Sequence, residues 1–268
     1  MVPGANRAGV VDICLSRSHL WGQFVIRRLE ENLRVQASGD PVLVDFDRWA
    51  LSLGDGEAAI VSGEDMVTLR PDLCVEIQAG SGEAKGLEEF CQRIFPNIEE
   101  NYKTPGWLEG RAVLAPTNLA VDRINDVVTN SIPGEETVLL SSDMVDRAED
   151  LLRYNVEYIN TLKPAGLPKH KLRLKPGMTL MLLRNLNPKR ELCNGTRMTF
   201  DRVLQNKILE CTVSSAAGRR KVFIPRITLR PKPGQYPVDW SRRQFPVAPA
   251  ASFTVNKSQV SAQIVGIC

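Results

Sequence analysis

The chain has 268 residues, of which 43% are hydrophobic and 24% are charged. This composition is typical of a globular protein with one large domain or two smaller ones, and it excludes a disordered chain. The net charge of +3 and the isoelectric point near 8.5 do not identify a nucleic-acid partner, because a basic footprint depends on where the cations cluster.

Cysteine and histidine usage argues against a metal site. The six cysteines include no C-x-x-C pair, and the chain has two histidines. A structural zinc site needs closely spaced ligands, so we expect no metal. The first residues do not resemble a signal peptide, and no apolar run approaches the roughly 18 residues of a membrane span. We therefore expect a soluble protein with reduced thiols, in the cytosol or the nucleus.

The first third of the chain predicts two helices with a strand between them. Apolar residues recur at helical spacing over 8–20 and over 41–53, and a glycine-containing turn follows the second helix. The short apolar and basic run 24–29 predicts a strand. The glycine-rich stretch 78–86 predicts a surface loop, and a phosphate-binding loop is excluded because no Gly-Lys-Thr/Ser follows it.

A strand, a turn and a helix follow one another in the middle of the chain. The segment 111–118 is a short apolar run followed by a turn, and apolar residues at helical spacing predict a helix over 119–128. Such units build open α/β sheets, whose ligands bind at the carboxyl ends of the strands. Thr117 and Asn118 stand at that end of the predicted strand.

The pattern changes near residue 172, where short apolar runs alternate with turn signals such as Pro176-Gly177 and Asn194-Gly195. The runs lie at 172–174, 178–183, 197–200, 208–213 and 221–224. This alternation predicts a small all-β barrel of about 70 residues.

Six motifs occur in a fixed order along the chain. They are LEENLR, LAPTN, LKPGMTLMLLRNLNPKRELCNGTR, VFIPRITL, RRQFPV and FTVNKSQ. In this order they resemble the petite-integration-frequency (PIF-type) DNA helicases, and most of all the branch fused to Helitron transposons. The similarity runs along nearly the whole chain, from Pro3 to Cys268. One hexamer would be a weak signal, whereas six in the right order are specific.

The resemblance implies the fold and the domain organisation. Helicases of this family have two RecA-like motor domains, which bind ATP between them and move 5′ to 3′ on single-stranded DNA. On this chain, the resemblance implies an α/β fold in which 1–170 and 241–268 form the RecA-like second motor domain of a superfamily-one helicase. Residues 172–240 would then be a small SH3-like β-barrel inserted into it.

Arg34 is implied to be an arginine finger. It ends the pattern Leu29-x-x-Asn32-x-Arg34, and in the family this arginine reaches the ATP γ-phosphate from the second motor domain. A guanidinium stays charged and offers a fixed fork of donors, which suits the charge that develops on a transferred phosphoryl group. From the residues alone, the alternative is a surface salt bridge of Arg34 with a neighbouring glutamate.

Two further segments are candidates for DNA contact. Pro116, Thr117 and Asn118 would touch the DNA backbone through a hydroxyl, an amide and main-chain N–H groups, which fix position without reading sequence. The alternative is an ordinary helix cap, and one residue can do both. Asn194 and Gly195 form either a hairpin turn or a loop along the path of the DNA strand. The cations that would assist such a loop are Arg184, Lys189, Arg190 and Arg197, unless they form a solvated face.

The last motif, Thr-x-x-Lys-Ser-Gln, is implied to contact DNA and to couple that contact to the nucleotide cleft. The implied DNA-binding residues are Thr254, Asn256 and Lys257, and the implied coupling residues are Ser258 and Gln259. The alternative is the polar end of a strand. The family has a glycine after the glutamine, where this chain has Val260, and a β-branched residue does not readily adopt the positive φ that glycine permits.

The groups that hydrolyse ATP in this class are missing from the sequence. There is no Gly-x-x-x-x-Gly-Lys-Thr/Ser loop to hold the phosphates and Mg²⁺. The family's paired acidic residues for Mg²⁺ and water and its glutamine sensor are missing as well, and the family places all of these groups upstream of the segment that matches Pro3. The family motif Tyr-Val-Ala-Leu-Ser-Arg lies beyond the last residue. We therefore expect a fragment of an ATP-dependent helicase that is inactive alone. The alternative is a non-catalytic or vestigial domain that binds single-stranded DNA.

The resemblance also implies partners, cofactors and location. The full-length family uses ATP and Mg²⁺, neither of which we expect to bind tightly to this chain alone. The implied partners are single-stranded DNA and the amino-terminal motor domain of the same polypeptide. The implied location is the nucleus, with the mitochondrion as the alternative for the full-length family. The implied processes are DNA repair, recombination, telomere maintenance and Helitron transposition.

Overall fold

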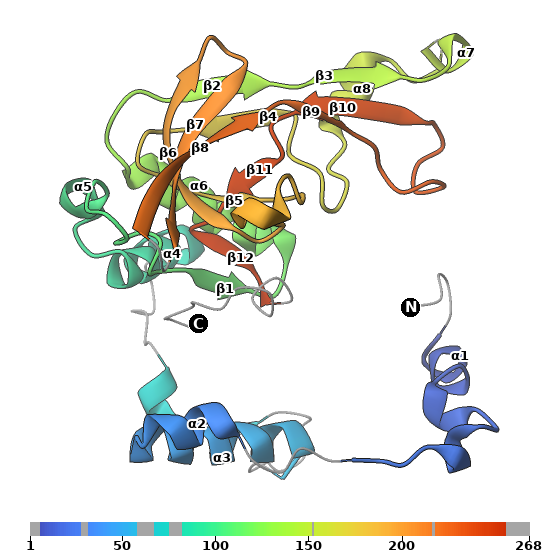
Figure 1. The fold of residues 1–268 in the computed structure, drawn as a ribbon, viewed down its shortest axis with the longest axis vertical. Coiled ribbons are helices and arrows are strands. Elements are labelled where there is room, and N and C mark those ends of the chain that lie inside the picture. The colour runs from blue at the N-terminus through green and yellow to red at the C-terminus, as the bar shows by residue number, and fades with distance from the viewer. Residues whose placement is uncertain are drawn as a thin grey trace. The chain divides into compact units, whose positions relative to one another are not determined.

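The computed structural model describes residues 6–27, 32–57, 67–74, 82–151, 153–215 and 218–255. Its contacts divide the chain into two compact units, Met1–Cys74 and Val75–Cys268 (Figure 1). Together they contain helices, parallel strands and antiparallel strands, so the predicted mixed α/β class is confirmed.

The regular structure of the first unit is helical. Its elements are α1 (Arg7–Asp12), η1 (Leu15–Arg17), η2 (Trp21–Gln23), α2 (Leu33–Ser38), α3 (Pro41–Asp55) and η3 (Pro71–Leu73). The α3 helix confirms the helix predicted over 41–53. The Asp40 side chain fixes its start by accepting a hydrogen bond from the Val42 N–H at 2.9 Å, and Gly56 fixes its end with a left-handed φ of 77°.

Two predictions for the first unit were wrong in part. A single helix was expected over 8–20, but the α-helix α1 ends at Asp12 and is followed by the two separate 3₁₀ turns η1 and η2. The Ser18 hydroxyl accepts a hydrogen bond from the Leu20 N–H, and such local bonds compete with helix propagation. The strand expected over 24–29 is not formed in 24–27, and residues 28 and 29 lie outside the described part of the chain. A short apolar run alone does not specify a strand, because a strand also needs a neighbour.

An α/β layer begins the second unit. Its elements are α4 (Gly82–Ile94), α5 (Ile98–Asn101), β1 (Val113–Ala115), α6 (Asn118–Ser131) and, much later in the chain, β12 (Ser252–Thr254). The strands β1 and β12 pair in parallel, and α6 packs on both of them. The predicted strand–turn–helix at 111–128 is therefore confirmed.

The glycine-rich stretch predicted as a loop over 78–86 is helical from Gly82 onward, where it forms the first turn of α4. Residues 78–81 lie outside the described part. The prediction gave weight to the glycines, whereas the apolar spacing of Leu87, Phe90 and Ile94 gives the helix a face that packs on the core. Packing of an amphipathic face outweighs the propensity cost of isolated glycines.

An antiparallel five-stranded sheet dominates the second unit. Its strand order is β11 (Val247–Pro249), β5 (Thr179–Leu182), β6 (Arg197–Leu204), β7 (Ile208–Ser215) and β8 (Gly218–Pro225). The short runs predicted from residue 172 onward are thus strands, joined by the predicted turns. Alternate side chains such as Met198, Phe200 and Leu209 are buried on one face.

Two smaller antiparallel sheets complete the second unit. One pairs β2 (Thr137–Leu140) with β4 (Lys171–Leu174), and the other has the order β3 (Ser142–Val145), β10 (Trp240–Gln244) and β9 (Ile227–Leu229). The helices α7 (Ala148–Leu151) and α8 (Val156–Thr161) follow β3, and the 3₁₀ turn η4 (Pro188–Arg190) follows β5. The β3 and β10 strands extend away from the five-stranded sheet (Figure 1).

One hydrophobic cluster joins the α/β layer to the five-stranded sheet. It contains Phe95 from the α4–α5 segment and Val128 from α6, together with Phe200 and Ile224 from the sheet. A second, small cluster of Ile159, Val238 and Trp240 lies under α8 and β10. The sheet and the helices of the second unit therefore share a core instead of each burying its own.

Candidate nucleic-acid interface

The carboxyl end of the β1–β12 pair brings together two of the predicted DNA-binding segments. In the register of this pair Ala115 lies opposite Thr254, so the strand ends of the two motifs are neighbours. Pro116, Thr117 and Asn118 continue from β1 and are all exposed. The structure therefore places Thr254 beside the segment that begins α6, although the two are far apart in the sequence.

Thr117 is the N-cap of α6. Its hydroxyl oxygen accepts a hydrogen bond from the Ala120 N–H at 3.3 Å, and its backbone is extended with φ −124°. The helix-cap interpretation is thus confirmed for Thr117. The cap satisfies one of the first N–H groups of α6, and the remaining N–H groups and the positive end of the helix dipole still favour an anion there.

Asn125 fixes α6 against β12, which sequence reasoning missed. Its side-chain amide donates to the Ser252 carbonyl oxygen at 2.9 Å, and its side-chain oxygen accepts from the Ser252 N–H at 2.9 Å. Both residues are buried. One signal could have found it, a polar residue within the apolar pattern of the helix, because a buried amide needs partners.

The other candidate residues of the LEENLR and FTVNKSQ motifs lie wholly or partly outside the described part of the chain. Asn256, Lys257, Ser258 and Gln259 lie outside the described residues. Arg34 lies in α2 of the first unit, and its side chain is also outside the described part. Its role as an arginine finger stays a prediction.

Asn194 and Gly195 form a turn before β6. Gly195 has a φ of 91°, and its N–H donates to the Leu182 carbonyl oxygen at 2.8 Å, while the Asn194 N–H donates to the Asn185 side chain at 2.7 Å. The backbone conformation at Gly195 therefore explains the glycine without a ligand. Contact of this turn with DNA stays a prediction.

Arg197 does not belong to a solvated basic face. Its guanidinium is enclosed and donates to four carbonyl oxygens from 108–111 and 250. Burial lowers the pKa of Arg197 to about 10, against the opposing effect of the Glu109 carboxylate. A group so enclosed cannot reach a DNA strand, so Arg197 ties β6 to the segment before β1. Lys189 and Arg190, by contrast, are exposed.

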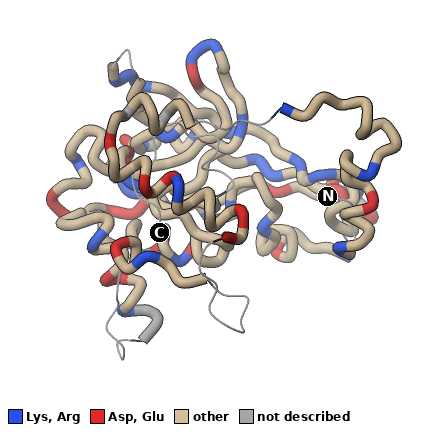
Figure 2. The backbone as a smooth tube through the Cα atoms, turned by 90° about the horizontal axis from the view of Figure 1, so that it is seen from below, with Lys and Arg blue, Asp and Glu red and all other residues tan. Residues whose placement is uncertain are grey.

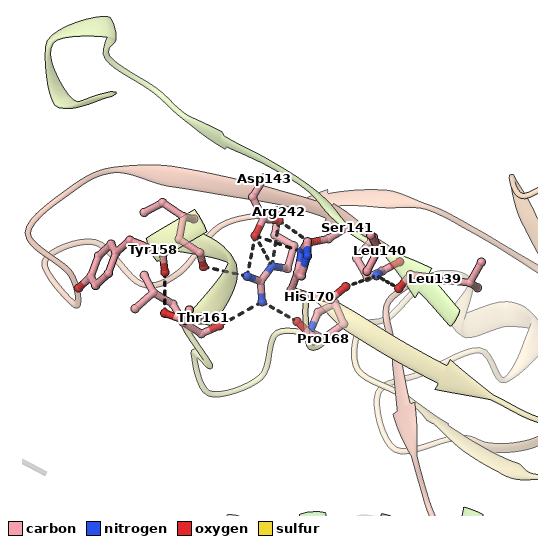
Figure 3. Close-up of polar contacts among 12 residues, drawn as sticks. Leu139, Leu140, Ser141, Asp143, Tyr158, Thr161, Pro168, His170 and Arg242 are labelled. Atoms are coloured by element: carbon pink, nitrogen blue, oxygen red, sulfur yellow. Dashed lines mark hydrogen bonds and ion pairs between the residues drawn. The ribbon is translucent and has the colours of Figure 1, made fainter. Parts of the chain in front are cut away.

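A buried ion pair organises the β3–β10 sheet. Arg242 and Asp143 both have fully buried side chains, and the guanidinium donates to both carboxylate oxygens at 2.6 to 3.0 Å (Figure 3). The remaining donors of Arg242 reach the carbonyl oxygens of Ile159, Leu162 and Pro168. One guanidinium therefore joins β10, β3, α8 and the loop that leads to β4.

His170 and Ser141 extend this polar network. The Ser141 hydroxyl donates to Asp143 at 2.6 Å and lies 2.7 Å from Nδ1 of His170 (Figure 3). Because a hydroxyl has a single hydrogen, Nδ1 of His170 carries the proton that Ser141 accepts. Desolvation lowers the pKa of His170, and the Arg242 charge acts in the same direction, whereas Asp143 opposes them. The arrangement is not a nucleophile–base pair, because the hydroxyl proton is already held by the carboxylate.

Neither the distribution of charge nor a cluster of metal ligands marks out an interface in the described part of the chain. Cations and carboxylates are interspersed along the backbone (Figure 2). Among the described residues, no three His, Cys, Asp or Glu side chains come together in a way that could hold a metal ion. In the same part of the chain, no helix is long and apolar enough to cross a membrane.

One family model matches part of the second unit. Residues 157–202, which run from α8 through β4 and β5 into β6, match the family described as "DNA helicase Pif1, 2B domain". The predicted resemblance to PIF-type helicases is confirmed. The Pif1 2B-domain match includes Asn194, Gly195 and the enclosed Arg197, whereas Thr117 and Thr254 lie outside it.

One solved Pif1 structure shares the fold over most of this chain. The crystal structure of the Pif1 helicase from Candida albicans matches with a TM-score of 0.53 and 20% identity, over 91% of this chain and 51% of that one. The unliganded Pif1 from Bacteroides sp matches with a TM-score of 0.39 and 19% identity, over 60% of this chain and 45% of that one. The chain thus spans about half the length of these Pif1 structures. A search of curated proteins found no significant match to this chain.

Proposed function

We propose that this chain is part of an ATP-dependent 5′-to-3′ DNA helicase and holds single-stranded DNA at the carboxyl end of the β1–β12 pair. The observation that carries the proposal is the parallel register that places Thr254 next to Pro116, Thr117 and Asn118. The Pif1 2B-domain match supports the helicase class.

Backbone recognition suits the chemistry at this end of the strands. The exposed N-terminus of α6 offers main-chain N–H groups and a partial positive charge to a phosphate. The Asn118 amide and the Thr254 hydroxyl add neutral donors, and Lys257 would add a charge. Such contacts hold a strand by its backbone and do not themselves read its sequence.

In this proposal the two parts of the second unit have different roles. The α/β layer, with β1, α6 and β12, belongs to a RecA-like second motor domain, to which 1–170 and 241–268 contribute. The antiparallel strands within 172–240 form the SH3-like barrel inserted into it. Arg34 would act on ATP and Mg²⁺ held by an amino-terminal motor domain, and Ser258 and Gln259 would couple that site to the DNA.

The activity of the chain alone follows from the same proposal. Without a phosphate-binding loop and acidic magnesium ligands, the chain binds neither ATP nor Mg²⁺ tightly and does not hydrolyse ATP. Helicases of this class serve nuclear or mitochondrial DNA repair, recombination, telomere maintenance or Helitron transposition, and we place the chain among them. The second candidate is a non-catalytic or vestigial domain that binds single-stranded DNA.

A charge substitution at the start of α6 tests the interface. Asn118→Asp favours the helix, because a carboxylate in the first turn suits the helix dipole, but it repels a phosphate. We expect it to weaken the binding of a labelled oligothymidine about tenfold at low ionic strength, measured by fluorescence anisotropy. The matched control is Asn155→Asp at the N-cap of α8, which makes the same charge change and can still cap its helix. Equal effects of the two substitutions, or no effect of either, would refute the interface.

A further inference from the structure

A cleft of about 320 Å³ opens in the second unit between the segment 102–108 and the five-stranded sheet. The segment supplies Tyr102, Lys103 and Thr104, and the sheet supplies Thr199, Asp201 and Thr212, with Arg219 from β8. The volume is within the range of small-ligand sites. None of the residues that line the cleft belongs to the interface proposed above.

The aromatic wall of the cleft is held rigidly. Gly177 has a φ of 90°, and a Cβ placed on it would lie 2.7 Å from Cδ2 of Tyr102. Only glycine permits both the backbone conformation and this approach. The Tyr102 ring is therefore packed against the backbone at 177 and forms a fixed side of the cleft.

The floor of the cleft is rich in hydrogen-bond acceptors. The Thr212 hydroxyl donates to Asp201 at 2.7 Å, and the Thr199 hydroxyl donates to the Glu109 carboxylate. Because each hydroxyl donates its single hydrogen to a carboxylate, both hydroxyl oxygens can only accept hydrogen bonds from a ligand. The second oxygen of Asp201 adds a charged acceptor. A ligand that fills this floor must bring N–H or O–H donors.

The rim of the cleft is cationic. Lys103 and Arg219 are both exposed and both line the cleft, one from the 102–108 segment and one from β8. The Lys103 ammonium lies 5.4 Å from the centre of the Tyr102 ring, on a long side chain that is free to move aside. A ligand that suits both the cationic rim and the acceptor-rich floor is anionic where it meets the rim and carries N–H or O–H donors where it meets the floor.

We propose that this cleft binds one nucleotide of single-stranded DNA, with an amino-bearing base inserted toward Asp201 and its phosphates on Lys103 and Arg219. The proposal rests on the proposed function, since it assumes that the chain binds single-stranded DNA. Adenine, cytosine and guanine each have an exocyclic amino group, which suits a carboxylate acceptor. Thymine has a single N–H between two carbonyl groups, whose oxygens would face the acceptors of the floor. The cleft therefore selects against thymine.

Base preference is the measurement that tests the cleft. We expect the full chain to bind labelled oligodeoxycytidylate and oligodeoxyadenylate of about ten nucleotides roughly fivefold more tightly than oligodeoxythymidylate, by fluorescence anisotropy at low ionic strength. Asp201→Asn should bring this ratio close to one, because the amide offers a donor to thymine and no charge to an amino group. It keeps an oxygen that can accept from Thr212, so the fold is preserved, as circular dichroism would check.

The rim supplies an independent variant on an exposed loop. Lys103→Glu should weaken binding of all three oligonucleotides about tenfold. The same charge change in Lys207→Glu, at an exposed lysine of the β6–β7 turn that does not line the cleft, should change binding less than twofold. The proposal is overturned by a ratio near one in the unsubstituted chain, by a ratio that Asp201→Asn leaves unchanged, or by equal effects of the two lysine variants. If Asn118→Asp weakens oligonucleotide binding while Asp201→Asn and Lys103→Glu leave it unchanged, the cleft proposal is overturned and the proposed function is retained. No binding of any oligonucleotide would overturn both proposals.

Discussion

Two neighbouring arginines in the RRQFPV motif have opposite environments. Arg242 is fully buried against Asp143, whereas Arg243, one residue along the same strand, is exposed. Successive side chains of a strand point to opposite faces, so one of the pair had to enter the interior. The following Gln244 is buried as well, and its amide donates to the carbonyl oxygens of Leu139 and His170. The buried polar residues of the motif, Arg242 and Gln244, are therefore satisfied within the fold.

Removing the partner of Arg242 should be costly. Asp143→Ala leaves a buried guanidinium without its counter-ion, and we expect a loss of about 3–5 kcal/mol in the free energy of unfolding, measured by urea denaturation. The exposed pair of Arg230 with Asp146 provides a matched control, and Asp146→Ala should cost less than about 1 kcal/mol. Similar losses in the two variants would show that the buried ion pair contributes no more to the free energy of unfolding than the exposed one.

The protonation of His170 should make stability depend on pH. Folding lowers the pKa of His170 below its ordinary value of 6.5, mainly by desolvation, so the unfolded chain binds the proton more readily. This contribution to stability is complete above the unfolded pKa and is lost as the pH falls through the folded pKa. We expect His170→Gln to flatten the fall in melting temperature between about pH 7 and pH 5, a window above the ordinary carboxylate pKa values. An unchanged slope would contradict this.

The helix α6 combines structural and proposed binding roles at one end. Thr117 caps it and Asn125 joins it to β12, so the orientation of its N-terminus is fixed before any ligand arrives. Such a helix end can hold a phosphate without reorganising, which reduces the entropic cost of binding.

The cap at Thr117 can be tested apart from DNA. Thr117→Val keeps the shape of the side chain but removes the oxygen that accepts from Ala120, and we expect it to lower the free energy of unfolding by about 1 kcal/mol. Thr117→Ser keeps that oxygen and should be nearly neutral. Thermal denaturation of both variants measures the difference, and equal losses would mean that the capping bond contributes nothing.

Local patterns predicted the elements better than they predicted the contacts between them. The helix over 41–53, the strand before Thr117 and the β runs after residue 172 follow from periodicity and turn residues, which act over a few positions. The helix at Gly82 was missed because its glycines suggested a loop. The pairing of β1 with β12 and the burial of Arg197 depend on residues far apart in the chain, so periodicity could not supply them.

At the scale of the whole second unit, the shared core couples the sheet to the helices. Phe95, in the α4–α5 segment, belongs to the same cluster as Phe200 in β6. We expect Phe95→Ala to cost about 3–5 kcal/mol and to raise hydrogen exchange in β6 and β7 as well as in α4. Leu140→Ala, at an exposed position of β2, is the control. Faster exchange confined to the helices would show that the sheet folds independently.

The proposed division of the helicase predicts how the chain behaves alone. Because the residues that hold ATP phosphates and Mg²⁺ are missing from the sequence, we expect no ATP hydrolysis stimulated by single-stranded DNA. A coupled phosphate-release assay measures this directly. Turnover that Arg34→Ala abolishes would contradict the expectation and would place a complete catalytic site on this chain.

The reciprocal hydrogen bonds between Asn125 and Ser252 have a consequence for the β1–β12 sheet. A side-chain amide carries the same N–H and C=O groups as a peptide unit, so Asn125 takes the place that one residue of an adjacent strand would occupy. Another strand could pair with β12 at Ser252 only by displacing this amide and leaving it unsatisfied in the interior. The sheet is thus closed by a helix on the β12 side, and a further strand is accommodated more readily beside β1.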